Sequence, residues 1–237
     1  MTKTQAKTQG VARLTEWHSA YPNSVRWRLT EEGLEVEGSG VERTRGGPTT
    51  VRAIWKLYHE EINRAAVKYF VPCALIVATI ATESGGDPGA ERREPGFESY
   101  EATPHRISVG LMQTLISTAR DMMSPAPCAE WKRKVIDRDW LARPDYSILA
   151  GTAYINHQRY ATRLDPPLVA CAYNAGGIYR DNHVANRWRM RQYPIGTGEH
   201  CDRFVKWFND AVAMLSVHDV SPVIPYHYYF KAGLGGA

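Results

Sequence analysis

The sequence predicts a mainly α-helical protein that carries a small β-hairpin near its N-terminus. Three observations support this: apolar residues recur every three or four positions in several segments after residue 48, one segment is apolar on every face, and strict alternation of apolar and charged residues is confined to the first 48 residues. The chain has 237 residues, 43% of them hydrophobic and 23% charged, which is typical of a globular protein with a sizeable core.

The hairpin is predicted from two alternating runs. Val25, Trp27 and Leu29 alternate mainly with arginines, and Leu34 and Val36 then alternate with glutamates after a Glu-Glu-Gly turn. Glycine-rich breakers follow at 38–40 and 45–48. We therefore predict an appendage over 1–48, a main domain over 49–218 and a C-terminal tail over 219–237.

Helical spacing dominates the main domain. The segment 51–70 is amphipathic, whereas 74–81 is apolar on all sides and predicts a buried helix, with Pro72 in its first turn and Gly85 after its end. Glu83 falls in the last turn of that buried helix. Further helices are predicted over 117–123, 146–163, 168–173 and 203–215.

Several classes of partner and cofactor are not supported. The formal charge of +4 is spread along the chain and no nucleic-acid module is present, so we expect no nucleic-acid partner. The longest apolar run, 71–81, is interrupted by Pro72 and is far shorter than the roughly 20 residues that span a bilayer. The histidines lack metal-ligand spacing, so we expect no metal and no cofactor.

The four cysteines are widely separated, at positions 73, 128, 171 and 201. Buried free thiols are the expectation, with one disulfide as the alternative.

Glu83 is the first candidate for chemistry. A carboxyl group at the end of an apolar helix is desolvated, and a helix C-terminus disfavours negative charge, so we expect a raised pKa. A carboxyl group that keeps its proton near neutral pH can protonate a glycosidic oxygen. The alternative is a partly exposed glutamate that closes the helix.

Three segments strengthen the catalytic interpretation. They are ATESGGDP at 81–88, SVGLMQ at 108–113 and AYNAGG at 172–177. In this order they resemble the signature segments of the soluble lytic transglycosylase (SLT) catalytic domain, a relative of goose-type lysozyme. The resemblance implies a lysozyme-like α-helical (α+β) fold over about 51–208 and a peptidoglycan-degrading enzyme.

The resemblance also implies roles for individual residues. Glu83 would be the catalytic acid and then the base, and the other matched residues, which would bind substrate or orient the acid, are Ser84, Ser108, Gln113, Tyr173 and Asn174. The implied reaction cleaves the β-1,4 bond between N-acetylmuramic acid and N-acetylglucosamine. Attack by the muramoyl 6-hydroxyl would then give a 1,6-anhydro end, so no second carboxylate is needed.

The stretch between Pro88 and Ser108 departs from the family pattern because it is longer than in short members and rich in acids. Glu94 is the leading candidate there for a second acid, which would make the enzyme a hydrolytic muramidase. A solvated loop is the alternative for these acids. An inactive wall-binding or structural component is the alternative from another functional class.

The expected partner is the peptidoglycan glycan strand. Met1 is followed by a mainly polar segment over 2–9, which lacks the apolar stretch of a secretory signal, although the substrate lies outside the cytoplasmic membrane. We therefore expect delivery to the cell wall by a phage or by a secretion apparatus, with a phage-related origin preferred. The appendage, which holds none of the matched residues, is expected to be dispensable for the chemistry.

Overall fold

The computed structural model describes residues 14–124 and 132–217. Its helices are α2 (Thr49–Tyr69), α3 (Cys73–Glu83), α4 (Ile116–Met123), α5 (Arg138–Ala142), α6 (Pro144–His157), α7 (Arg159–Thr162), α8 (Pro166–Ala175) and α9 (Glu199–Val217), with a short 3-10 turn at Arg133–Val135. Its strands are β1 (Trp27–Thr30), β2 (Gly33–Val36), β3 (Glu91–Arg93), β4 (Ile107–Val109) and β5 (Thr114–Leu115). The predicted C-terminal tail and Cys128 lie outside the described residues.

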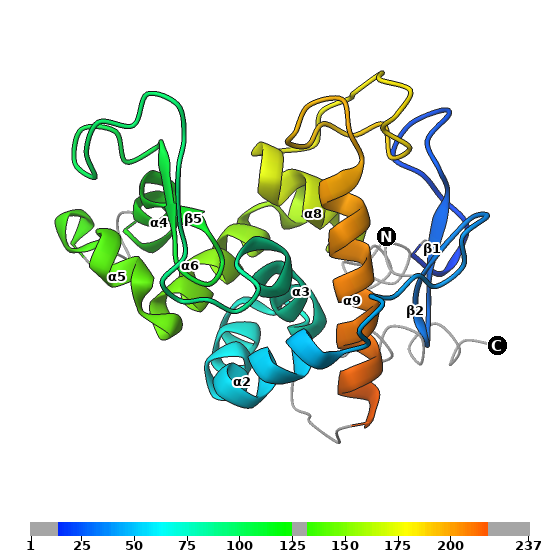
Figure 1. Ribbon diagram of the computed structural model, residues 1–237, viewed down its shortest axis with the longest axis horizontal. Coiled ribbons are helices and arrows are strands. Elements are labelled where there is room, and N and C mark those ends of the chain that lie inside the picture. Colours follow the sequence, from blue (N-terminus) through cyan, green and yellow to red (C-terminus); the bar gives the residue numbers. More distant parts are fainter. Residues whose placement is uncertain (1–13, 125–131, 218–237) are drawn as a thin grey trace, which may run out of the picture.

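The mainly helical fold with an N-terminal hairpin is confirmed (Figure 1). Helix α2 is kinked at Tyr58, which has a φ of −131°. The helix predicted over 146–163 is divided into α6 and α7 at Gln158. At this break the Gln158 amide donates to the carbonyl of Ala172 at 2.9 Å, a tertiary contact that local periodicity does not reveal.

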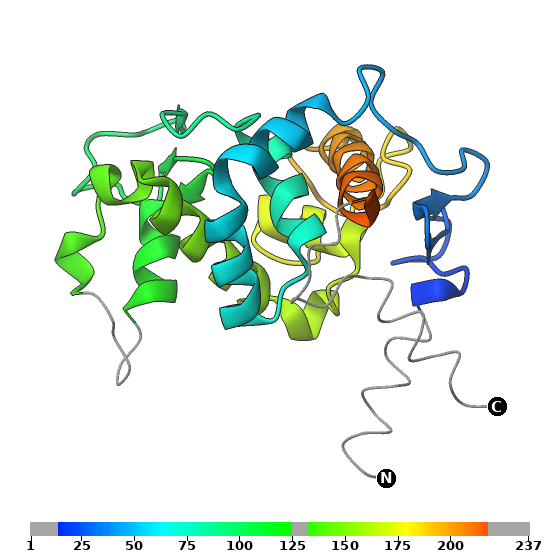
Figure 2. The same cartoon turned by 90° about the horizontal axis from the view of Figure 1, so that it is seen from below.

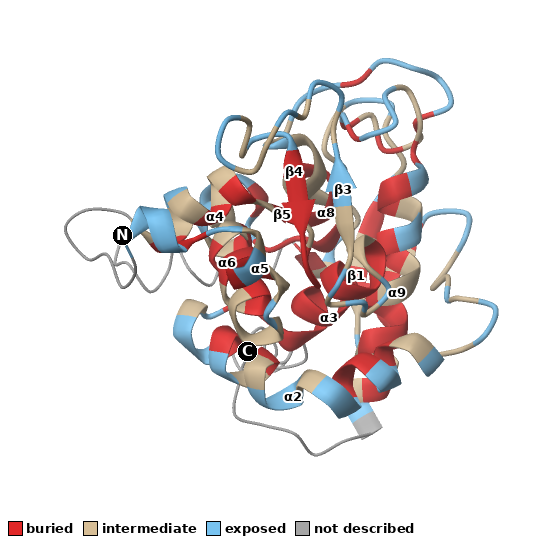
Figure 3. Cartoon of the chain, turned by 60° about the vertical axis from the view of Figure 1, so that its left-hand side comes forward, coloured by how far each residue is buried: buried red, intermediate tan, exposed pale blue. Residues whose placement is uncertain are grey.

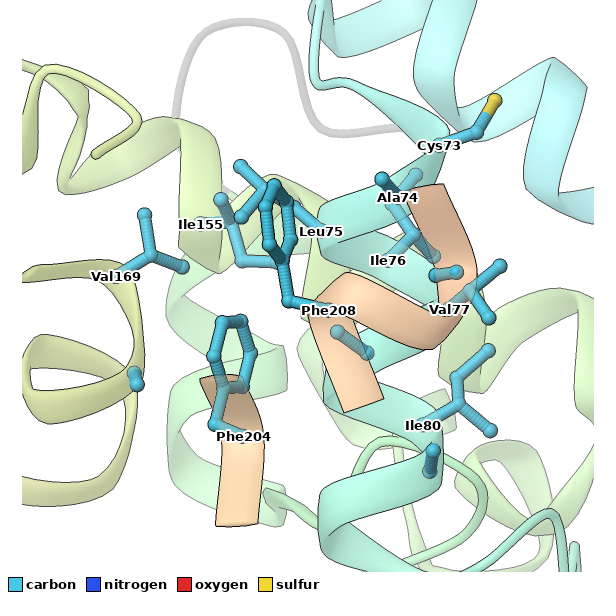
Figure 4. Close-up of a cluster of buried hydrophobic side chains, with 14 of the residues drawn as sticks. Cys73, Ala74, Leu75, Ile76, Val77, Ile80, Ile155, Val169, Phe204 and Phe208 are labelled. Atoms are coloured by element: carbon cyan, nitrogen blue, oxygen red, sulfur yellow. The ribbon is translucent and has the colours of Figure 1, made fainter. Parts of the chain in front are cut away.

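The larger hydrophobic core joins α2, α3, α8 and α9 to the hairpin. Nearly every residue of α3 is buried, as Figure 3 shows. Phe204 and Phe208 of α9, Leu75 of α3 and Val169 of α8 belong to this buried cluster, which Figure 4 shows. Burying each such side chain contributes about 1.5–3 kcal/mol, so α3 is fixed firmly in place.

A second core lies on the other side of α6 and contains side chains from β4, α4 and α5. Helix α6 contributes to both cores, with Ile148 and Ile155 in the first and Ala150 and Ala153 in the second. Gly151 lets the segment after β4 approach closely, because a Cβ there would lie 2.5 Å from the sulfur of Met112.

Strands β3, β4 and β5 form an antiparallel sheet that the sequence did not predict. The three strands have only three, three and two residues, too few to show alternation. The turn after β4 needs Gly110, which has a φ of +80° and would place a Cβ 2.2 Å from the carbonyl oxygen of Leu141.

The hairpin lies beside α9 (Figure 2), and its apolar side chains belong to the larger core. Trp27 and Leu34 are fully buried. The side chain of Asn209 on α9 accepts from the Leu34 amide at 2.6 Å and donates to the Leu34 carbonyl at 3.1 Å. The Trp27 indole donates to Asp165 at 2.9 Å. The hairpin therefore shares the larger core, and the predicted domain boundaries stay a prediction.

Among the described helices, none is both long enough and apolar enough to cross a membrane. Cys73, Cys171 and Cys201 are buried free thiols, as the sequence predicted for them.

Candidate active site around Glu83

Glu83 is the last residue of α3, at the end of an otherwise buried helix. Its side chain is 18% exposed. The hydroxyl of Ser84 donates to the carbonyl of Leu111 at 2.7 Å and accepts from the amide of Gly86 at 3.1 Å. Ser84 therefore attaches the end of α3 to the segment between β4 and β5, which fixes the position of Glu83.

The pKa of Glu83 is raised from 4.5 to about 7, because burial disfavours the ionised carboxylate. Arg203 on α9 and Arg92 on β3 act in the opposite direction, since their positive charges stabilise the carboxylate. The carboxyl group is therefore protonated at neutral pH in a large fraction of molecules, yet it ionises readily. This balance suits a group that must both give and take a proton.

His200, in the first turn of α9, lies close to Glu83. Its Nε2 lies 3.7 Å from Oε1 of Glu83, too far for a hydrogen bond, and its side chain is 4% exposed. Burial, together with the positive charges of Arg203 and Arg92, lowers the pKa of His200 to about 3. The imidazole is therefore neutral near pH 7, and it lies beside Glu83 without adding a positive charge.

Ser108 and Gln113 form a hydrogen-bonded group beside the β4–β5 turn. The Ser108 hydroxyl donates to Oε1 of Gln113 at 3.1 Å. The Gln113 amide nitrogen donates to the carbonyls of Ala90 and Gly110 at 2.8 and 3.0 Å. Both hydrogens of the side-chain amide are therefore bonded within the protein. These bonds hold Gln113 in a conformation with a positive φ of +45°. Its predicted contact with substrate stays a prediction.

Tyr173 lies near Glu83, whose negative charge helps to raise the phenol's pKa, although burial is the larger cause. We expected the phenol to hydrogen-bond the carboxyl group. Instead it donates to the carbonyl of Met112 at 2.8 Å and pairs with the hydroxyl of Thr114 at 3.1 Å. The one phenolic proton is therefore taken by the main chain. Asn174 accepts from the amide of Tyr193 at 2.6 Å.

Glu94 lies in the turn after β3, with its side chain 38% exposed. Its Oε1 is 3.1 Å from Nε of Arg92. The same Arg92 lowers the pKa of Glu83, so this arginine links the two carboxyl groups electrostatically. Whether Glu94 serves as a second acid stays a prediction.

The sequence interpretation did not include His200 or Arg203 in the site. Nothing local marks these two residues, because they reach Glu83 only through the packing of α9 on α3. Within residues 14–124 and 132–217, no group of three or more His, Cys, Asp and Glu side chains is arranged to hold a metal ion.

The family model described as "Transglycosylase SLT domain" matches residues 60–192, which is more than half of the 237 residues. The match includes Glu83 and the five residues singled out with it, whereas His200 and Arg203 follow its end. No curated protein matches the chain.

Proposed function

Because this chain belongs to the transglycosylase SLT domain family and is a peptidoglycan lytic transglycosylase, we propose that it cleaves the β-1,4 bond between N-acetylmuramic acid and N-acetylglucosamine to leave 1,6-anhydro ends. The observation that carries this proposal is the environment of Glu83. A single carboxyl group with a pKa near 7 can act as acid and then as base in one reaction.

In the first step, the Glu83 carboxyl group gives its proton to the glycosidic oxygen as the bond from that oxygen to C1 of the muramoyl residue breaks. The leaving sugar departs with a hydroxyl group, and an oxocarbenium-like state remains. Glu83 is then a carboxylate. Arg203 and Arg92 stabilise this negative charge, and the first turn of α9, which holds His200, supports it with the positive end of the helix.

In the second step, the Glu83 carboxylate removes the proton from the muramoyl 6-hydroxyl as its oxygen bonds to C1. The proton returns to Glu83 and the anhydro ring closes, so the enzyme regains its starting state. The nucleophile belongs to the substrate itself, which gives it a high effective concentration. A water molecule and a second carboxylate are then not required.

The second candidate is a hydrolytic muramidase, which the shared Arg92 between Glu83 and Glu94 favours. In that case Glu94 would orient a water molecule on the opposite face of the sugar. Glu94→Gln would then abolish cleavage, whereas a transglycosylase would keep most of its rate. Delivery by a phage or a secretion apparatus stays a prediction from the sequence.

Mass spectrometry of digested sacculi separates these two reactions. We expect wild-type enzyme to release muropeptides that end in 1,6-anhydromuramic acid, because the 6-hydroxyl is the proposed nucleophile. Mutanolysin digestion of the same sacculi gives the reducing-end standard. A product set dominated by reducing ends from the first minutes of digestion would overturn transglycosylation in favour of hydrolysis.

A further inference from the structure

The loop between α8 and α9 contains a hollow that the proposed reaction does not use. It has a volume of about 400 Å³ and is lined by Arg180, Asp181, Asn182, His183, Arg191 and Ile195. Figure 1 shows this loop, coloured yellow to orange, beyond the adjoining ends of α8 and α9. Those two helix ends carry Asn174 and His200 of the candidate site.

Two hydrogen bonds fix the hollow relative to these residues. The amide of Tyr193 donates to the side chain of Asn174 at 2.6 Å, and the amide of Cys201 donates to Oε1 of Gln192 at 2.8 Å. Arg191 directly precedes Gln192, so one wall of the hollow is attached to both helix ends. A ligand in the hollow would therefore lie beside the site and not on a distant face.

Asp181 makes the loop stiff. It accepts from the backbone and ring nitrogens of His183 at 3.0 and 2.5 Å, from the amide of Asn186 at 3.0 Å and from the amide of Gly196 at 3.2 Å. Although burial alone would raise it, these hydrogen bonds lower the pKa of Asp181 to about 2. Its negative charge is thus engaged within the loop.

The arginines of the loop fall into two groups. Arg187 pairs with Glu42 and Asp202, and Arg189 donates to main-chain carbonyls. Arg180 and Arg191 instead lie over aromatic rings, at 5.8 Å from Tyr21 and 5.3 Å from Tyr179. In the part of the chain that the structure describes, neither has an ion pair or a side-chain hydrogen bond.

We propose that this hollow binds a carboxylate of the peptide attached to the muramic acid residue of the substrate, held by Arg180 and Arg191. Guanidinium groups recognise carboxylates with paired hydrogen bonds. Their stacking on Tyr21 and Tyr179 reduces the entropy lost on binding. The half-exposed Ile195 offers an apolar contact for the aliphatic part of a peptide. This inference rests on the proposed function, because peptidoglycan supplies peptides with free carboxylates next to the bond that is cleaved.

The test compares two substrates, glycan strands that carry their peptides and the same strands after an amidase has removed them. We expect Arg180→Gln/Arg191→Gln to lose about tenfold in kcat/KM on peptide-bearing strands, mainly through KM, and to match wild type on bare strands. Arg45→Gln/Arg163→Gln removes the same charge from exposed arginines elsewhere and should match wild type on both.

A binding experiment gives a readout that does not depend on catalysis. In NMR titrations with the tripeptide L-alanyl-γ-D-glutamyl-L-lysine, the guanidinium Nε–H signals of Arg180 and Arg191 should shift, and amidation of the peptide's carboxyl groups should abolish the shift.

Equal losses of activity on both substrates, or no shift with the free peptide, would overturn the inference. A shift with inorganic phosphate but not with the peptide would also overturn the inference, and would indicate that the hollow binds a phosphate-bearing polymer instead. Inactivity of wild type on both substrates, with the peptide shift intact, would overturn the proposed function alone.

Discussion

The raised pKa of Glu83 is the net result of burial and of two nearby arginines that act in the opposite direction. Burial at the end of α3 favours the protonated form, and Arg203 and Arg92 favour the carboxylate. Because the first step needs the protonated acid, we expect kcat/KM on glycan strands to fall as pH rises through about 7. The measurement is a pH–rate profile. A descending limb near the ordinary glutamate value of about 4.3 would contradict the burial argument.

Substitutions of Arg203 and His200 should shift the descending limb of the pH–rate profile in opposite directions. Arg203→Gln removes a positive charge that stabilises the carboxylate, so the descending limb should move to higher pH. His200→Ala admits water beside Glu83, so the limb should move to lower pH by about one unit. His200→Gln keeps most of the volume and should shift the limb less. A loss of rate at every pH without displacement of the profile would show that His200 acts only in folding.

At the scale of elements, local pattern accounts for what the sequence predicted and for what it missed. Helix α3 was predicted because its apolar residues and flanking Pro72 and Gly85 are contiguous. The sheet of β3, β4 and β5 was missed because its strands are too short to show a period. The family segments indicated Glu83 and its neighbours, whereas His200 is brought to Glu83 only by the packing of α9 on α3.

The attachment of the hairpin to α9 depends on Asn209, which is fully buried. Its side chain satisfies the amide and carbonyl of Leu34, so Asn209→Ala leaves both groups without a partner. Each buried unsatisfied group costs about 1–3 kcal/mol, and we expect a loss of about 2–4 kcal/mol in the free energy of unfolding. Urea denaturation measures it. The exposed Asn182→Ala is the control and should change stability little; equal stability of the two variants would contradict this contact.

The shared core bears on the prediction that residues 1–48 are dispensable for chemistry. A fragment from residue 49 onward exposes the surface that Trp27 and Leu34 cover, so we expect a lower Tm. Below that Tm, its kcat on soluble glycan strands should remain close to that of the full chain, because the residues around Glu83 all follow residue 49. A folded but inactive fragment would show that the hairpin contributes to the site.

At the scale of the whole molecule, the pKa of Glu83 makes stability depend on pH. A folded pKa of about 7 against 4.5 means that Glu83 destabilises the native state increasingly as pH rises from 4.5 through 7. The full difference corresponds to about 3 kcal/mol. We therefore expect Glu83→Gln to be more stable than wild type at pH 8 by up to about 3 kcal/mol. At pH 4 the two should unfold alike in urea. The same difference at both pH values would show that ionisation of Glu83 is not the cause.

The most direct test of the account is cleavage of purified sacculi by Glu83→Gln. The substitution keeps the size of the side chain and removes its titrating proton, so both proposed steps are lost. We predict no detectable release of muropeptides by a variant whose circular dichroism matches wild type. Release at a rate close to that of wild type, from a correctly folded Glu83→Gln protein, would contradict the assignment of Glu83 as the catalytic acid.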